Sequence, residues 1–159
     1  MEIKEKLCTN RNFPVKSFYS PVLKKCLTFY RQGYCFMVSS KRTNETQIEK
    51  ITDVDLGNMY LLYDQALIVR SSSSILFFKI DEETRKWTKY CEKKDMRGQI
   101  YFIRGNVRIQ IITDEKIYFF LIDKQTFEPT LENVMNNYMN CSVMMFGPLV
   151  RFSITYKTN

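Results

Sequence analysis

The residues best suited to chemistry lie in one short stretch, 85–108, where positive charge alternates with aromatic rings. This stretch holds eight basic and two acidic residues, a net charge of +6 out of +7 for the whole chain. Lysine and arginine neutralise phosphates, and flat rings stack on unpaired bases. The pattern therefore predicts a nucleic-acid-binding surface without enzymatic activity. The residues assigned to it are Arg85, Lys86, Trp87, Lys89, Lys93, Lys94, Arg97, Arg104 and Arg108.

The same stretch has a second interpretation, a solvated basic loop that keeps the protein soluble. In this interpretation Trp87 anchors the loop to the core. Arg104 and Arg108 flank a predicted tight turn between two strands, so we expect their positions to be rigid. The lysines of 88–94 are expected on a mobile loop.

A second candidate surface lies near the C-terminus and is rich in methionine. Methionine fills irregular core space, and it also adapts to irregular partner surfaces. This stretch therefore predicts either core packing or a protein-binding face. The competing hypothesis for function is a protein-interaction or assembly module, such as a viral structural or host-interaction protein, that binds a protein partner or forms a homo-oligomer through sheet edges and this face. The residues assigned to the face are Met135, Met139, Met144, Met145 and Phe146.

Composition argues against catalysis and cofactors. Histidine is absent, so the commonest general base and the usual nucleophile–histidine pairs are missing. The sequence contains no glycine-rich phosphate loop and no G-x-S-x-G turn. The five cysteines form no C-x-x-C pair, so they predict buried reduced thiols and no zinc site. We expect no catalytic residue, no metal and no cofactor.

Composition also bears on location and origin. The N-terminus has no apolar core of a signal peptide, and no apolar run reaches the length of a membrane span. We therefore expect an intracellular protein, cytoplasmic or nuclear, that is not secreted and not bound to a membrane. Ala66 is the only alanine, whereas lysine, asparagine and isoleucine are abundant. This bias is typical of AT-rich genomes, such as those of many large DNA viruses and some parasites.

The basic stretch leads into the clearest structural signal, a three-stranded antiparallel meander over 99–123. Residues 100–103 are apolar and meet Gly105-Asn106, a pair that tolerates the positive φ of a tight turn. Residues 107–112 alternate with the period of a half-buried strand, and 117–122 return as a third strand.

A similar unit occurs 42 residues earlier. ILFFKIDEET at 75–84 and IYFFLIDKQT at 117–126 share six of ten residues, and 60–74 aligns with 101–116 across one gap. The sequence of each unit predicts three strands and a closing turn, in which Asp and Thr side chains hydrogen-bond the backbone. A repeat of about 40 residues made of short strands has the period of a propeller blade. The alternative is two ordinary meanders with similar turns. The chain is too short to close a ring without partner chains or a larger parent protein.

We therefore predict a mostly β protein of about seven to nine antiparallel strands, arranged as a barrel, sandwich or blade-like stack. The prediction is a single domain, 1–159, with an extended N-terminal arm at 1–22 and similar units at 60–84 and 101–126. Helical spacing of apolar residues after Thr130 predicts one short C-terminal helix near 131–139. The predicted core is Ile75, Phe77, Ile100, Phe102, Val107, Ile109, Ile111, Ile117, Phe119, Leu131, Val134 and Tyr138.

Overall fold

The chain is almost entirely β. The computed structural model describes residues 14–39, 46–81, 83–103, 105, 107–137, 141–146 and 149–154, the last two ranges through their backbone alone. These residues form antiparallel sheets and a single 3-10 turn, so the mostly β, antiparallel prediction is confirmed. Internal contacts divide the chain into two compact units, unit 1 (Met1–Lys94) and unit 2 (Asp95–Asn159).

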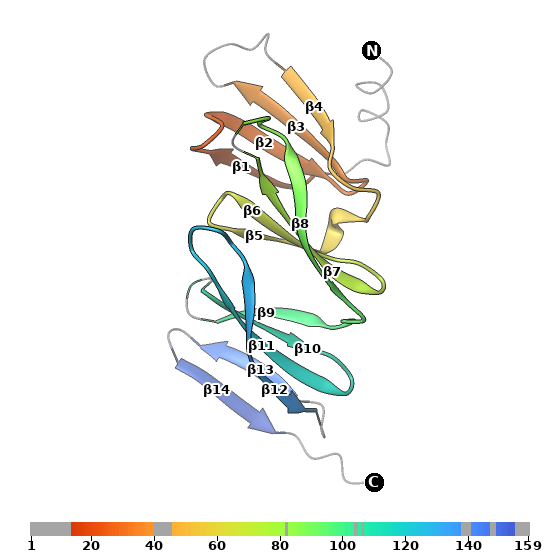
Figure 1. Ribbon diagram of the computed structural model, residues 1–159, viewed down its shortest axis with the longest axis vertical. Coiled ribbons are helices and arrows are strands. Elements are labelled where there is room, and N and C mark those ends of the chain that lie inside the picture. Colours follow the sequence, from red (N-terminus) through yellow and green to blue (C-terminus); the bar gives the residue numbers. More distant parts are fainter. Residues whose placement is uncertain are drawn as a thin grey trace. The chain divides into compact units, whose positions relative to one another are not determined.

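Unit 1 consists of two four-stranded meanders, in which each strand pairs with the next strand along the chain (Figure 1). The first sheet contains β1 (Pro14–Ser20), β2 (Lys25–Tyr30), β3 (Tyr34–Ser39) and β4 (Thr46–Lys50). The 3-10 turn η1 (Leu56–Asn58) leads to the second sheet, which contains β5 (Met59–Leu62), β6 (Ala66–Arg70), β7 (Ser74–Ile80) and β8 (Trp87–Lys94).

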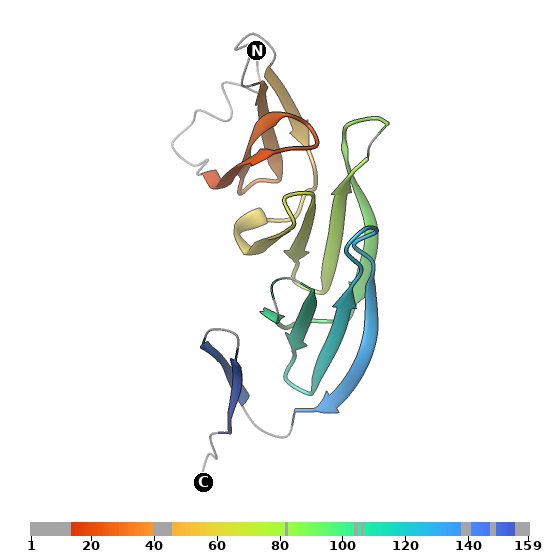
Figure 2. The same ribbon diagram turned by 90° about the vertical axis from the view of Figure 1, so that its left-hand side faces the viewer.

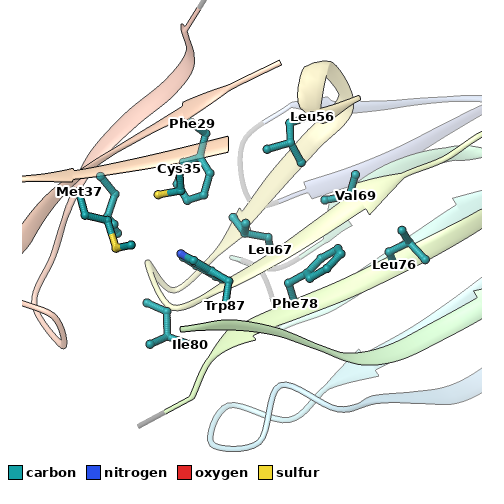
Figure 3. Close-up of a cluster of buried hydrophobic side chains, with 11 residues drawn as sticks. Phe29, Cys35, Met37, Leu56, Leu67, Val69, Leu76, Phe78, Ile80 and Trp87 are labelled. Carbon is teal, nitrogen blue, oxygen red and sulfur yellow. The ribbon is translucent and has the colours of Figure 1, made fainter. Parts of the chain in front are cut away.

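The core of unit 1 lies between these two sheets. Phe29 of β2 belongs to the same buried cluster as Leu67 of β6 and Phe78 of β7 (Figure 3). Leu27 of β2 is also part of this cluster. Phe29 stacks on Phe18 at 5.7 Å and meets the edge of Trp87 at 5.5 Å between ring centroids. Burial of each large apolar side chain stabilises the fold by about 1.5–3 kcal/mol. The cluster therefore joins the two sheets.

Strand β8 corrects one prediction. The lysines of 88–94 were expected on a mobile loop, but they lie on this regular strand. The strand pairs with β7 from Trp87 to Lys94. Without β8, the backbone N–H and C=O groups along one edge of β7 would lack partners. Backbone pairing with this edge therefore places 87–94 in a strand, although these residues are mostly polar.

Unit 2 contains the predicted meander and continues it with a fourth strand, and these strands run from green to blue in Figure 2. Its sheet has the order β12-β11-β10-β9, so the expected three strands over 99–123 are confirmed. A two-stranded sheet follows it in the sequence. The strands are β9 (Gln99–Ile103), β10 (Arg108–Ile112), β11 (Lys116–Ile122), β12 (Pro129–Asn136), β13 (Cys141–Phe146) and β14 (Leu149–Ile154).

The predicted C-terminal helix near 131–139 is wrong, because residues 131–136 belong to strand β12. An isolated helix of nine residues is marginal in water, whereas the edge of β11 supplies a ladder from Lys116 to Ile122. The predicted core is corrected at the same place. Leu131 is 50% exposed and Val134 is 39% exposed, and Tyr138 lies outside the described residues.

The 42-residue repeat is preserved in the pairing of the strands. Every Cα pair of β6 with β7, and of β7 with β8, recurs 42 residues later in β10–β11 and β11–β12. Even the irregularities coincide, because the register shifts between Phe77 and Phe78 and again between Phe119 and Phe120. Tyr90 and Glu132 are the bulged residues at these two shifts. The two sheets therefore share one internal geometry.

The closing turns of the two units also match. The Asp81 Oδ1 atom accepts the backbone N–H of Thr84 at 2.7 Å, and Asp123 Oδ1 accepts that of Thr126 at the same distance. The residue after each threonine has a positive φ, 58° at Arg85 and 62° at Phe127. These hydrogen bonds hold the pKa of both aspartates below its ordinary value.

This shift predicts an acid sensitivity that begins in the two turns. A carboxyl whose pKa is lower in the folded chain adds stability above its unfolded pKa, 3.8, and that stability disappears as pH falls through the folded value. We expect the melting temperature to fall below about pH 4, and to fall less steeply in Asp81→Asn/Asp123→Asn, which keeps the acceptor oxygens. Calorimetry across this pH range measures both slopes, and equal slopes would contradict the prediction.

One buried residue is polar where the equivalent residue of the repeat is apolar. Gln110 is fully buried, and neither atom of its amide group has a hydrogen-bond partner among the described residues. The equivalent residue in unit 1 is Ile68, which is also fully buried. A buried polar group without a partner costs about 1–3 kcal/mol.

We therefore expect Gln110→Ile to raise the free energy of unfolding by about 1–3 kcal/mol. Isoleucine removes the unpaired polar atoms and suits a strand. Urea denaturation followed by circular dichroism measures the change, and Gln110→Ala is the control that removes the amide but leaves a cavity. A lower stability for Gln110→Ile than for wild type would show that the amide has a structural partner.

Cys26 and Cys35 are free thiols. Cys35 is buried as predicted, and burial raises the pKa of its thiol well above the ordinary value. Cys91 is half-buried, whereas Cys26 is exposed, so the prediction of buried thiols is wrong for Cys26. It lies on β2 beside the buried Leu27 and points to the opposite face of the sheet. Cys8 and Cys141 fall outside the side chains described.

Candidate functional site

The predicted nucleic-acid-binding residues are divided between the two units. Unit 1 contains 85–94, which form the β7–β8 turn and strand β8. Unit 2 contains Arg97, before β9, and Arg108, on β10, whereas Arg104 lies outside the described residues.

The aromatic rings of the unit 1 half pack inside that unit. Trp87 is 5% exposed, and its backbone N–H donates to Glu49 Oε1 at 2.9 Å. The half-buried Tyr90 meets Phe77 edge-on at 6.1 Å between ring centroids, and Lys79 Nζ lies 5.0 Å from the Tyr90 centroid. Base stacking needs an exposed ring face, which Trp87 does not offer.

Several cations of the basic stretch interact with groups of their own unit. Arg85 Nη1 donates to the backbone oxygen of Val22 at 2.9 Å. Lys89 Nζ lies 2.9 Å from Glu92 Oε2, and this hydrogen bond lowers the pKa of Glu92. Lys86 and Lys94 are exposed.

Arg108 forms a bidentate ion pair across its sheet. Its Nε and Nη2 atoms donate to Glu132 Oε2 at 2.8 Å and Oε1 at 3.0 Å. The pair spans β11, which lies between β10 and β12, and it raises the pKa of Arg108. Glu132 therefore already neutralises the cation that was assigned to phosphate.

The methionine-rich face is described in part. Met135 lies on β12 and is 51% exposed. Met144, Met145 and Phe146 lie on β13, where the backbone alone is described, and Met139 lies outside the described residues. Among the predicted interaction residues, the side chain of Met135 is therefore the one that the structure describes, and it is exposed.

The repeat shows that the surface around Met135 is unusual. Leu131, Val134 and Met135 occupy the positions of Lys89, Glu92 and Lys93 in β8. One strand thus presents three charged side chains, and the other presents three apolar side chains that are 50%, 39% and 51% exposed. We call Leu131, Val134 and Met135 the apolar row of β12.

The bulge at Glu132 determines which faces the apolar row uses. Leu131 pairs with Phe120 and Val134 pairs with Tyr118, so these two apolar side chains share one face of the sheet. Met135 pairs with Ile117 and lies on the other face. In the part of the chain that the structure describes, β12 is an edge strand of its sheet, with β11 as its paired neighbour (Figure 1). Apolar side chains therefore flank both sides of an exposed strand edge.

Other kinds of site receive no support from the described residues. They contain no group of three or more histidine, cysteine, aspartate or glutamate side chains able to hold a metal ion. None of these residues lies in a helix that could span a membrane.

Comparisons with known proteins give the fold and no family. No family model and no curated protein matches the chain. The β-propeller domain of Cps50 (Swd1) from Myceliophteria thermophila superimposes with a TM-score of 0.54 at 13% identity, over 86% of this chain and 46% of that one. A protein from Lactobacillus plantarum gives a TM-score of 0.50 at 12% identity, over 76% and 41%.

A third solved structure has a similar degree of likeness. A functionally unknown protein from Desulfotomaculum acetoxidans gives a TM-score of 0.50 at 12% identity, over 79% of this chain and 43% of that one. The chain thus spans less than half the length of these three neighbours. At such identities the likeness concerns the fold alone, and it supports the blade-like alternative among the predicted β architectures.

Proposed function

We propose that this chain is a non-enzymatic protein-interaction module that binds a protein partner through β12. The observation that carries the proposal is the contrast between β8 and β12. At equivalent positions of one repeat, β8 has Lys89, Glu92 and Lys93, whereas β12 has the exposed apolar row.

The contrast matters because an edge strand exposes backbone groups that other chains can pair with. Proteins commonly protect such edges with charged side chains, lysine above all. The charges of β8 follow this rule, and the apolar row of β12 departs from it. A partner strand would pair with the edge through backbone hydrogen bonds and cover the apolar side chains.

The comparisons support an assembly role in a second way. Propellers arrange about four to eight four-stranded blades around a channel, and three four-stranded sheets are described here. The match with this chain covers 46% of the Cps50 (Swd1) propeller domain, so more than half of that domain has no counterpart in the match. Blades from a partner chain or from a longer parent protein would complete such an array.

The test moves the charges of β8 onto β12. We expect the purified wild-type chain to associate with itself in sedimentation velocity, with little dependence on salt, because the contact is apolar. The variant Leu131→Lys/Val134→Glu/Met135→Lys should sediment as a monomer with an unchanged circular dichroism spectrum.

The reciprocal variant is the matched control. Lys89→Leu/Glu92→Val/Lys93→Met places the apolar row on β8, and we expect it to associate more strongly than wild type. Self-association that is the same in wild type and in the charged variant would overturn the role of β12. A wild-type chain that stays monomeric would exclude a second copy as the partner.

A second candidate function, nucleic-acid binding, rests on the concentration of charge in 85–108. Lys86, Lys94 and Arg97 of this stretch are exposed. Exposed cations release counterions when they contact phosphates, so binding would weaken steeply with salt.

The ion pair of Arg108 makes this candidate testable. The logarithm of a binding constant for nucleic acid falls linearly with the logarithm of the salt concentration. We expect Lys86→Gln/Lys94→Gln/Arg97→Gln to reduce the magnitude of this slope by about 0.7–0.9 for each phosphate that the wild-type side chains neutralise. Arg108→Gln should change the slope little, because Glu132 already neutralises that cation. Fluorescence anisotropy with labelled single-stranded and duplex DNA across a salt series measures both. Absence of binding at low salt would reject this function.

A further inference from the structure

A small hollow of about 190 Å³ opens in unit 1 between two turns. One is the β1–β2 turn, and the other is the β7–β8 turn. The hollow is lined by 22–25, Met37, Gln47 and Arg85. We call it the basic pocket.

The register of the first sheet explains the floor of the basic pocket. Met37 pairs with Leu27 on one side and with Gln47 on the other, so these three side chains share the face that carries the core. Lys25 lies on the same face, two residues before Leu27. Met37 is 1% exposed and closes the bottom, whereas Lys25 and Gln47 are half-buried. The core face of this sheet thus ends in an apolar floor with a polar rim.

Arg85 reaches the basic pocket from the second sheet and is held in place twice. Its backbone N–H donates to the oxygen of Asp81 at 2.9 Å, and its Nη1 atom donates to the oxygen of Val22 at 2.9 Å. The equivalent residue in unit 2 is Phe127, which adopts nearly the same φ. The conformation of this turn therefore does not require arginine. The guanidinium group of Arg85 is a feature that the equivalent turn of unit 2 lacks.

Lys24, Lys25 and Arg85 are the charged residues among the described residues that line the basic pocket, and all three are cations. Further along the same face, Glu49 accepts the backbone N–H of Trp87, and burial raises its pKa. Three cations around one hollow repel one another, so an anionic group would bind there favourably.

We propose that the basic pocket binds the acidic side chain of a partner peptide. Its volume suits one side chain, and its floor of Met37 can contact the methylene groups of glutamate. The Arg85 guanidinium group offers further N–H donors in the planar arrangement that matches a carboxylate. The site belongs to unit 1 and does not depend on the role proposed for β12. A phosphoserine side chain offers the same anionic chemistry, and the test separates the two.

The test uses three fluorescently labelled peptides that differ at one central residue, glutamate, phosphoserine or glutamine. We expect the full chain to bind the glutamate or the phosphoserine peptide, and to bind the glutamine peptide at least about tenfold more weakly. The stronger of the first two identifies the source of the anion. Equal binding of all three peptides would overturn the proposal.

Two double variants, each of which removes two positive charges, distinguish binding in the basic pocket from general electrostatic attraction between the protein and the peptide. Lys25→Gln/Arg85→Gln should weaken binding about tenfold or more, whereas Lys16→Gln/Lys94→Gln should leave it nearly unchanged. Lys16 and Lys94 are exposed cations of the same unit that do not line the basic pocket. Fluorescence of Trp87, the only tryptophan, verifies that unit 1 is folded in each variant.

Two results would refute the assignment. One is an equal loss in the two variants, which would mean that affinity follows net charge alone. The other is complete competition by a single-stranded oligonucleotide of the same charge as the peptide, which would assign the cations to phosphates of nucleic acid. Arg85→Phe introduces the residue of the equivalent turn, so it keeps the turn geometry, and it should reduce binding as much as Arg85→Gln does.

Discussion

Gly33→Ala is expected to reduce the free energy of unfolding of unit 1 by about 3 kcal/mol or more. Gly33 has a φ of 87°, and a Cβ atom built on it would lie 1.8 Å from the backbone oxygen of Thr52. Its own oxygen accepts the N–H of Ile51 at 2.8 Å. A methyl group there must push away the segment that follows β4, and it breaks this hydrogen bond.

The control is Gly105→Ala, in unit 2. Gly105 also has a positive φ, 61°, but its Cβ position is open, with no atom within 4 Å among the described residues. That variant should lose about 1–2 kcal/mol from backbone conformation alone. Urea denaturation followed by circular dichroism and by Trp87 fluorescence measures both variants. Equal losses would show that the contact with Thr52 relaxes freely.

The second large effect is expected from Phe77→Ala, which should cost about 3–5 kcal/mol. Phe77 is fully buried and pairs with Ile68 and Cys91. Its repeat equivalent, Phe119, has the same strand geometry but is half-buried. Phe119→Ala should therefore cost clearly less than Phe77→Ala.

This pair of variants tests burial at constant backbone geometry. Denaturation of both proteins under the same conditions gives the two differences in unfolding free energy. A loss for Phe119→Ala as large as that for Phe77→Ala would mean that Phe119 is covered in solution. That result would point to association of unit 2 in the wild-type protein, and sedimentation velocity of the same samples would detect it.

The fold class and the meanders could be predicted because their signals are local. Alternation in 107–112 and the matching turns at Asp81 and Asp123 are both visible within ten residues of sequence. The structure extends the 42-residue repeat from these segments to the pairing of whole strands.

The fourth strand of each unit could not be predicted in the same way. Strands β8 and β12 share one identical residue at equivalent positions, Thr88 and Thr130. Their sequences are free to diverge because backbone pairing with β7 and β11 fixes their position. In β12 the apolar residues happen to fall at helical spacing, so a helix was predicted at the very residues that form the apolar row.

The candidate site depended on contacts between distant residues. Arg108 and Glu132 are 24 residues apart in sequence, and β11 separates their strands. The basic pocket joins Arg85 to the β1–β2 turn, more than 60 residues away. One signal for β12 was present in the sequence, because extending the 42-residue alignment past 126 places the apolar row opposite Lys89, Glu92 and Lys93.

The most direct test of the proposed function is photo-crosslinking at two equivalent positions of the repeat. A benzophenone amino acid is placed at Val134 on β12 in one protein and at Glu92 on β8 in another. Both are incorporated into the full chain in its native cells, and the products are identified by mass spectrometry. We predict one defined protein adduct from position 134, absent from position 92 and abolished in Leu131→Lys/Met135→Lys. The same adducts from both positions, or none from either, would contradict the account.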